Sequence, residues 1–187
     1  MLWKSHLELE LSSYSLHHID MVSLGGDGEA IWRITGVYGY PNDEEKHKTW
    51  ALLKSLNRSD LPWLCFGDFN KILSQNEKTG NNAKKQVLIR GFQEVEHLCE
   101  LQDMGYTGHA FTWSNCRGGE QNVQERLDRF LSNLAWLNTF PWYQVSHLPK
   151  KRPGHLPILL KCFQSTLPRP KGAKKKKHPC RFEKDWT

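Results

Sequence analysis

The stretch Leu61-Pro62-Trp63-Leu64-Cys65-Phe66-Gly67-Asp68-Phe69-Asn70 decides the fold that we expect for this chain. Five of its first six residues are apolar, a run too short for a helix and typical of a strand buried on both faces. Gly67 then lets the backbone turn, and two polar residues follow at once. Polar groups just beyond the carboxyl end of a buried strand are where open α/β sheets carry their ligand chemistry.

Asp68 and Asn70 admit two interpretations. In an extended segment, the spacing of two residues places both side chains on one side, with Phe69 facing away. A carboxylate and a carboxamide held in this way can orient a water molecule and a phosphate oxygen, or share a hard metal ion. The alternative is an Asx turn that closes the strand. The tetrapeptide alone does not decide between them.

The composition is that of a globular protein. A length of 187 residues suffices for one domain with a full core, or for a piece of a larger one. No apolar run approaches the roughly 18 residues of a membrane span, and no secretory signal is visible, so we expect an intracellular protein. The five cysteines form no C-x-x-C pair, which argues against structural zinc and a disulfide framework.

The positive charge is concentrated at one end of the chain. Residues 167–187 hold eight basic and two acidic side chains, which accounts for the whole net charge of +6. We therefore expect a domain over 1–166 and a basic, disordered linker or tail over 167–187. Lys174 to Lys177 could hold phosphates through salt-sensitive contacts, and the alternative is a solvated linker.

Strands mixed with helices predict an α/β domain with some antiparallel sheet. Strands are expected, from period-2 alternation and β-branched or aromatic residues, at 7–11, 18–24, 31–38, 61–66, 111–114, 125–130, 145–148 and 156–162. Helices are expected, from apolar residues at helical spacing, after a cap at Asn42 or Asp43, over 88–99 with a stop at Gly105, and over 134–140. A polar loop is expected over 74–85.

Five motifs follow one another in a recognisable order: Val37-Tyr38-Gly39-Tyr40-Pro41, Gly67-Asp68-Phe69-Asn70, Phe111-Thr112-Trp113-Ser114, Arg126-Leu127-Asp128-Arg129 and Gly154-His155-Leu156-Pro157-Ile158. With these motifs the chain resembles the endonuclease/exonuclease/phosphatase (DNase I-like) superfamily. More closely, it is similar to the apurinic-endonuclease-type domain of plant LINE (non-LTR) retrotransposon polyproteins. The similarity runs from about Leu2 to Ile158, and Cys180 to Glu183 resembles the segment that leads toward a reverse transcriptase.

The resemblance implies a fold and an activity. The fold would be a sandwich of two β-sheets flanked by helices. The activity would be DNA phosphodiester hydrolysis that depends on Mg²⁺ or Mn²⁺, carried out in the nucleus beside the reverse transcriptase domain of the same polyprotein.

The resemblance also implies roles for single residues. The carboxylate of Asp68 would bind the metal ion and activate the attacking water, which the amide of Asn70 would position. His155 would stabilise the charge that develops on the phosphate, and Asp128 would fix its tautomer and orientation. Tyr38 would contact the phosphate.

Three further residues would bind substrate: Thr112, Trp113 and Arg126. Each assignment has an ordinary structural alternative. Tyr38 and Trp113 could be core aromatics, Asp128 could pair with its arginine neighbours at the surface, and His155 could be an exposed histidine in a loop.

Two departures from the family pattern bear on activity. The chain starts at what looks like the third strand, so we expect the first strand–helix–strand unit, with its metal-binding Asn and Glu, to be missing. The family's Ser-Asp-His motif reads Pro153-Gly154-His155, which leaves Asp68 nearly alone as a metal ligand. We therefore expect an impaired nuclease. The alternatives are a non-catalytic remnant that binds nucleic acid and a phosphatase for a small phosphorylated substrate.

Overall fold

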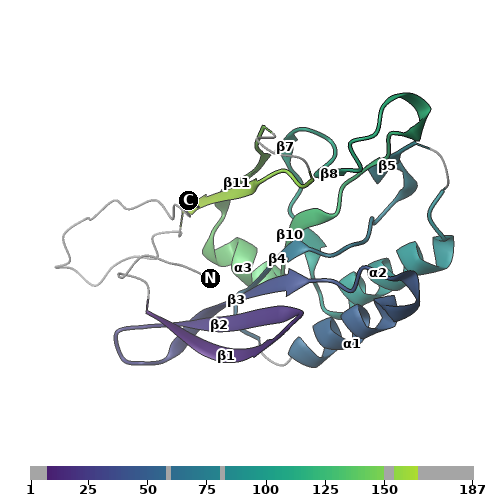
Figure 1. Ribbon diagram of the computed structural model, residues 1–187. Coiled ribbons are helices and arrows are strands. Elements are labelled where there is room, and N and C mark those ends of the chain that lie inside the picture. Colours follow the sequence, from purple (N-terminus) through teal and green to yellow (C-terminus); the bar gives the residue numbers. More distant parts are fainter. Residues whose placement is uncertain (1–7, 58–59, 81–82, 150–153, 164–187) are drawn as a thin grey trace.

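The computed structural model describes residues 8–57, 60–80, 83–149 and 154–163 and shows two facing β-sheets with helices packed on the outside (Figure 1). The boundary that the sequence predicts at 166/167 and the basic tail lie outside these residues. In the described part of the chain, no helix is long and apolar enough to cross a membrane.

The larger sheet has six strands in the order β1-β2-β3-β4-β10-β6. The first three strands pair antiparallel, as predicted, whereas β3 pairs parallel with β4, and β4 pairs antiparallel with β10. The bounds are Leu9–Ser15 (β1), His18–Leu24 (β2), Ala30–Tyr38 (β3), Trp63–Asp68 (β4), Asp128–Ser132 (β10) and Gln102–Asp103 (β6).

The central strand β4 is buried on both faces, which confirms the prediction from its apolar run. Trp63 and Cys65 belong to one core cluster, together with Leu53 and Phe92 of two helices. Leu64 points to the other face and belongs to a second cluster. The helices α1 (Lys46–Leu56) and α2 (Gln86–Leu98) therefore cover one face of the sheet (Figure 1).

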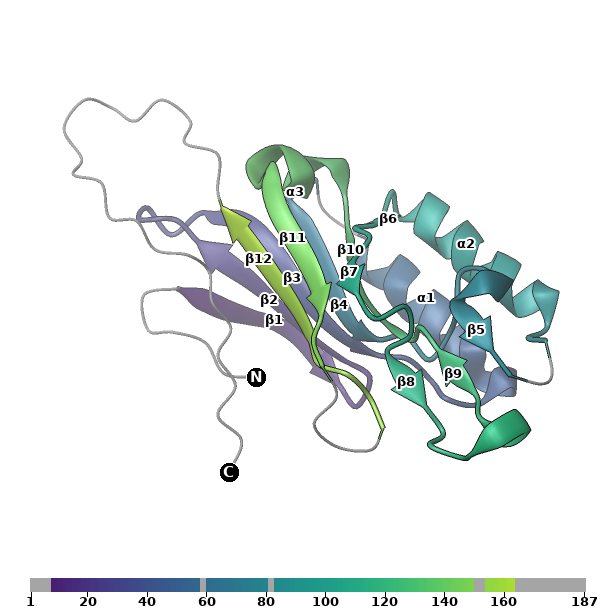
Figure 2. The same cartoon turned by 90° about the horizontal axis from the view of Figure 1, so that it is seen from above.

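A smaller sheet covers the other face. It has the order β12-β11-β7, with β12 at Ile158–Phe163, β11 at Trp142–His147 and β7 at Thr107–Gly108. Figure 2 shows β11 and β12 in the layer beside the larger sheet, next to α3 (Leu134–Thr139). Side chains of both sheets share the second core cluster, so the predicted two-sheet sandwich flanked by helices is confirmed.

The predicted strand over 125–130 is wrong, because the chain changes sheets there. Residues 124–125 form β9, which lies between β5 (Lys78–Thr79) and β8 (Trp113–Ser114) in a third sheet, and β10 begins three residues later. At this break, the backbone N–H groups of Leu127 and of Asp128, the first residue of β10, donate to the hydroxyl of Thr112 and not to a neighbouring strand. A local pattern of apolar residues does not reveal this interruption.

Three other predicted details differ. The segment 74–85 is not all loop, because it contains a 3-10 turn (Gln75–Glu77) and β5. Neither Asn42 nor Asp43 caps α1 with its side chain, because a 3-10 turn over Asp43–Glu45 leads into that helix and Glu45 occupies the N-cap position. The second helix ends at Leu98, and the left-handed backbone of Glu100 (φ 52°) follows it, so Gly105 is not its stop.

Candidate active site

Strand β4 ends in a carboxylate, that of Asp68, which the following turn holds in place. The backbone N–H of Asn70 donates to Oδ1 of Asp68 at 2.8 Å, and its side-chain amide donates to Oδ2 at 3.0 Å. Asn70 has a φ of 52°, so the expected extended geometry is wrong, although Phe69 is fully buried as expected. Asparagine tolerates this left-handed conformation better than most residues. The Asx turn and the functional site are thus one structure.

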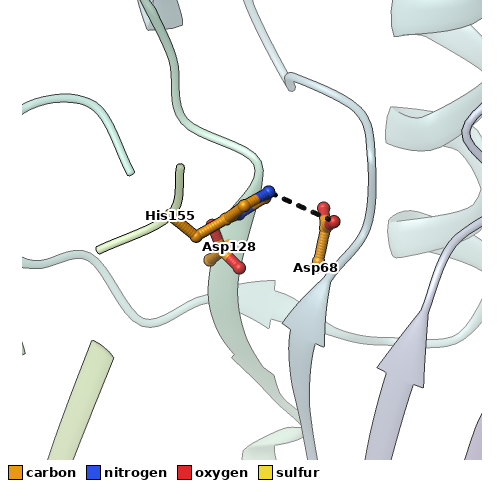
Figure 3. A group of neighbouring side chains, drawn as sticks. All are labelled: Asp68, Asp128 and His155. Carbon is orange, nitrogen blue, oxygen red and sulfur yellow. Dashed lines mark hydrogen bonds and ion pairs between the residues drawn. The ribbon is translucent and has the colours of Figure 1, made fainter. Parts of the chain in front are cut away.

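Asp128 and His155 complete the group. Asp128 opens β10 at the register position opposite Asp68. Its Oδ2 accepts a hydrogen bond of 2.8 Å from Nδ1 of His155, and Nε2 of the same ring lies 3.9 Å from Oδ2 of Asp68 (Figure 3). The side chains of Asp68, Asp128 and His155 are 14%, 13% and 39% exposed, so the histidine is the part of the group most open to solvent.

Thr112 and Trp113 contact the backbone of the segments that carry Asp128 and His155. The hydroxyl of Thr112 accepts hydrogen bonds from the N–H groups of Leu127 and Asp128, and its carbonyl accepts one from Leu156. Trp113 forms a β-bridge with His155. The prediction that Thr112 binds substrate is corrected, because its side chain is completely buried. The structure gives it the role of positioning the loops that carry the aspartate and the histidine.

Trp113 is partly buried and packs against a small core cluster of Ile72, Ile89 and Leu127. Most of the Trp113 side chain is therefore part of the core, as the alternative interpretation had it. Its backbone bridge to His155 also makes it a neighbour of the site.

Tyr38 ends β3 beside the end of β4, but it is not in the group of Asp68, Asp128 and His155. It occupies the position opposite Asp68 in the parallel pairing of β3 and β4. Its half-exposed ring stacks on His17, with ring centroids 6.0 Å apart. His17 also donates from Nδ1 to the carbonyl of Tyr38. The turn between β1 and β2 thus supports the tyrosine, a contact that no local sequence pattern indicates.

Arg126 lies away from the site. Its guanidinium, only 6% exposed, pairs with Glu77 at 2.8 Å and Asp103 at 2.7 Å. The fully buried Arg129 binds the same two carboxylates. Burial alone would raise the pKa of these carboxyls, but the arginines hold it below its ordinary value. The predicted substrate contact of Arg126 is therefore corrected to a place in a buried ion network.

The electrostatics of the group favour a base near neutral pH. Burial, followed by the charge of Asp128, raises the pKa of Asp68 to about 6. The N–H of Asn70, His155 and Lys46 act in the opposite direction. Lys46 is a residue that the sequence analysis missed. Lys46 precedes Trp50 by four residues, and this spacing places both on the buried face of α1, which could have indicated that Lys46 is buried.

The donor set fits a divalent cation. One ligand atom from each of Asp68, Asp128 and His155 lies within 4.8 Å of the others. Within the described ranges, these three form the one group of acidic, histidine or cysteine side chains close enough to share a metal ion. Two carboxylates and an imidazole suit Mn²⁺ and, with added water, Mg²⁺. The repulsion that raises the pKa of Asp68 is what a bound cation would relieve.

Comparison with known proteins identifies the fold. No protein-family model and no curated protein matches the sequence. The solved structures that match the chain have the DNase I-like endonuclease/exonuclease/phosphatase fold, and the chain shares this fold. The likeness is thus one of structure, at low sequence identity.

Three of these structures set the scale of the likeness. The endonuclease domain of TRAS1, a telomere-specific non-LTR retrotransposon, superposes with a TM-score of 0.67 at 13% identity, covering 90% of this chain and 73% of that one. The 3′-5′ exonuclease NExo of Neisseria meningitidis gives 0.57 at 18% identity, covering 84% and 70%. The AP endonuclease of Leishmania major gives 0.54 at 14%, covering 79% and 54%.

Proposed function

We propose that this chain is a DNA phosphodiesterase domain, a metal-dependent nicking endonuclease of the non-LTR retrotransposon type, whose catalytic rate is impaired. The observation that carries the proposal is the group formed by Asp68, Asp128 and His155 where β4 ends and β10 begins. A carboxylate faces an imidazole whose other nitrogen is held by a second carboxylate. The fold shared with a retrotransposon endonuclease and with other nucleases supports DNA as the substrate.

The residues of the site divide the work of phosphodiester hydrolysis. The ionised carboxylate of Asp68 accepts the proton of a water molecule that attacks phosphorus, as the bond from phosphorus to the leaving oxygen breaks. The amide of Asn70 fixes the orientation of that carboxylate. His155, held through Nδ1 by Asp128, presents Nε2 to the same space. A protonated imidazole there donates to a phosphoryl oxygen as negative charge grows on it.

A metal ion would be held by the carboxylates of Asp68 and Asp128, whereas Nε2 of His155, which carries the donated proton, would not coordinate it. Bound there, Mg²⁺ or Mn²⁺ supplies Lewis-acid polarisation of a phosphoryl oxygen.

The impairment follows from the ligands beside the histidine. Gly154 has no carboxylate to add negative charge to the site, and its φ of 107° is one that residues with a side chain rarely adopt. A metal ion contributes several kcal/mol to transition-state stabilisation, and each 1.36 kcal/mol is tenfold in rate. A weakly held ion therefore costs at least about a hundredfold.

Nicking of supercoiled plasmid by the purified protein tests the proposal. We expect nicking that EDTA stops, that the Asp68→Ala variant loses, and that is slower than about 0.01 s⁻¹, well under the usual 1–10³ s⁻¹. Asp27→Ala, a matched change at an exposed turn, should nick like the wild type. A turnover near 1 s⁻¹ would show that the enzyme is not impaired.

The substrate class is tested in the same way. Hydrolysis of sugar or inositol phosphates without plasmid nicking would replace the nuclease by a phosphatase. Binding of DNA without any hydrolysis that depends on Asp68 would leave a nucleic-acid-binding remnant.

A further inference from the structure

Two loops at the carboxyl ends of β3 and β4 are tied to each other. The N–H of Gly39 donates to the carbonyl of Asp68 at 2.7 Å. In return, the side-chain amide of Asn70 donates to the carbonyl of Gly39 at 2.9 Å. The backbones approach so closely that a methyl group on Gly39 would collide with the backbone of Phe69. The relative position of the two loops therefore decides how Asp68 is presented.

Lys46 reaches both loops at once from the first turn of α1. Its Nζ donates to the carbonyl of Tyr40 at 2.5 Å and to the carbonyl of Asn70 at 2.6 Å. The side chain is only 1% exposed. Thr49, one turn further along the helix, accepts a hydrogen bond from the N–H of Tyr40. The helix thus holds the tyrosine loop by two contacts and joins it to the aspartate loop through one ammonium group.

The charge of Lys46 is not needed for packing. Among the described residues, it makes no ion pair within 4.0 Å, so two carbonyl oxygens are what compensate for its burial. The charged groups that act on it are Lys71 and Lys84, which disfavour its positive charge, and Asp43 and Asp68, which favour it. Burial and the neighbouring Lys71 lower its pKa to about 8. An apolar side chain of similar length would avoid this cost.

We propose that Lys46 is a positioning residue whose ammonium group fixes the loop of Tyr38 against the loop of Asp68 and Asn70. A buried ammonium donating to two carbonyls makes charge-assisted hydrogen bonds, which are stronger and more directional than neutral ones. Its charge also lies close enough to favour the ionised form of Asp68. The effect on the reaction rate rests on the proposed function, but the effect on the loops does not.

The Lys46→Met variant tests the proposal, because methionine keeps the length of the side chain and removes both donated hydrogen bonds. Hydrogen exchange of single amides is the readout that does not depend on activity. We expect the amides of Gly39 and Asn70 to exchange at least about tenfold faster, while interior strand amides such as those of Ile34 and Cys65 stay within about twofold of the wild type. Uniform acceleration over the whole sheet, or unchanged loops, would overturn the proposal.

Lys54→Met provides the matched control, since Lys54 is exposed on the same helix. It should change neither the loops nor the rate. For DNA nicking, Lys46→Met should lower kcat by about tenfold or more, because it releases the loop that presents the Asp68 carboxylate. A wild-type protein without nicking would remove the proposed function, and the exchange experiment would still decide the role of Lys46.

A measurement on the wild type covers the case in which Lys46→Met does not fold. At pH 6, the ¹⁵Nζ signal of Lys46 should be that of an ammonium protected from exchange with water, unlike the signal of Lys54. It should titrate with an apparent pKa of about 8. Exchange as rapid as that of Lys54 would show that the two hydrogen bonds are absent, and the proposal would fail.

Discussion

Replacing Asp68 by Asn should make the protein more stable above pH 6 while it removes the base. The pKa of Asp68 is raised from 3.8 to about 6, chiefly by burial. Between these two values, the folded state keeps a proton that the unfolded state has released. The stability that this proton contributes is therefore present at low pH and is lost as the pH rises through about 6. Above pH 6, the ionised carboxylate lowers the free energy of unfolding.

The size of the gain follows from that pKa. At 1.36 kcal/mol per pKa unit, a rise from 3.8 to about 6 corresponds to about 3 kcal/mol. The side-chain amide that replaces the Asp68 carboxylate can still accept from the N–H of Asn70 but not from its side-chain amide, a loss of about 1 kcal/mol. The Asp68→Asn variant should thus be about 2 kcal/mol more stable at pH 8.

Urea unfolding of both proteins in EDTA, from pH 3.5 to pH 8, measures this difference. Groups that do not interact with Asp68 cancel, so the pH dependence of the difference reports Asp68 together with the charges coupled to it. The advantage of Asp68→Asn should grow between about pH 4 and pH 7 and then level off. Asp27→Asn, at an exposed position, should show no such growth. A variant that is less stable than the wild type at pH 8, or a difference that does not depend on pH, would show that Asp68 is not strained in this way.

Two further changes test the framework around the site. Arg129→Met should lower the free energy of unfolding by about 3 kcal/mol, because it leaves two largely buried carboxylates with one arginine partner in place of two. Urea unfolding measures the loss, and Arg90→Met, at an exposed position, is the control. Equal stability of the two variants would argue against the network. Asn133→Ala should cost about 1–2 kcal/mol in the same experiment, because Oδ1 of Asn133 accepts from two backbone N–H groups, at the start of α3 and of β4. Asn138→Ala, on the exposed side of α3, should cost less than about 0.5 kcal/mol, and a similar loss in both variants would contradict the cap.

The parts of the fold that the sequence predicted are those whose signal is local. The apolar run before Gly67 predicted β4, and apolar residues at helical spacing predicted the buried faces of α1 and α2. The order of short motifs predicted that Asp68, Asp128 and His155 share a site, although they lie far apart in the chain. Register then brings them together, since Asp68 and Asp128 face each other across β4 and β10.

The parts that it missed depend on partners distant in sequence. Arg126 was assigned to substrate because its carboxylate partners, Glu77 and Asp103, lie in a short 3-10 turn and in a two-residue strand without any recognisable pattern. Thr112 was assigned to substrate because nothing local shows that its hydroxyl accepts two hydrogen bonds from residues fifteen and sixteen positions later. Lys46 was overlooked because lysine is normally exposed. Each of these side chains is buried only in the folded sheet arrangement.

Plasmid nicking by wild type and Asp68→Ala, each with Mg²⁺ or Mn²⁺ and with EDTA, tests the assignment of the site most directly. We predict slow nicking by the wild type that either removal of the metal or loss of the Asp68 carboxylate abolishes. Nicking that continues at the same rate in EDTA, or in Asp68→Ala, would show that Asp68, Asp128 and His155 are not a phosphodiesterase site.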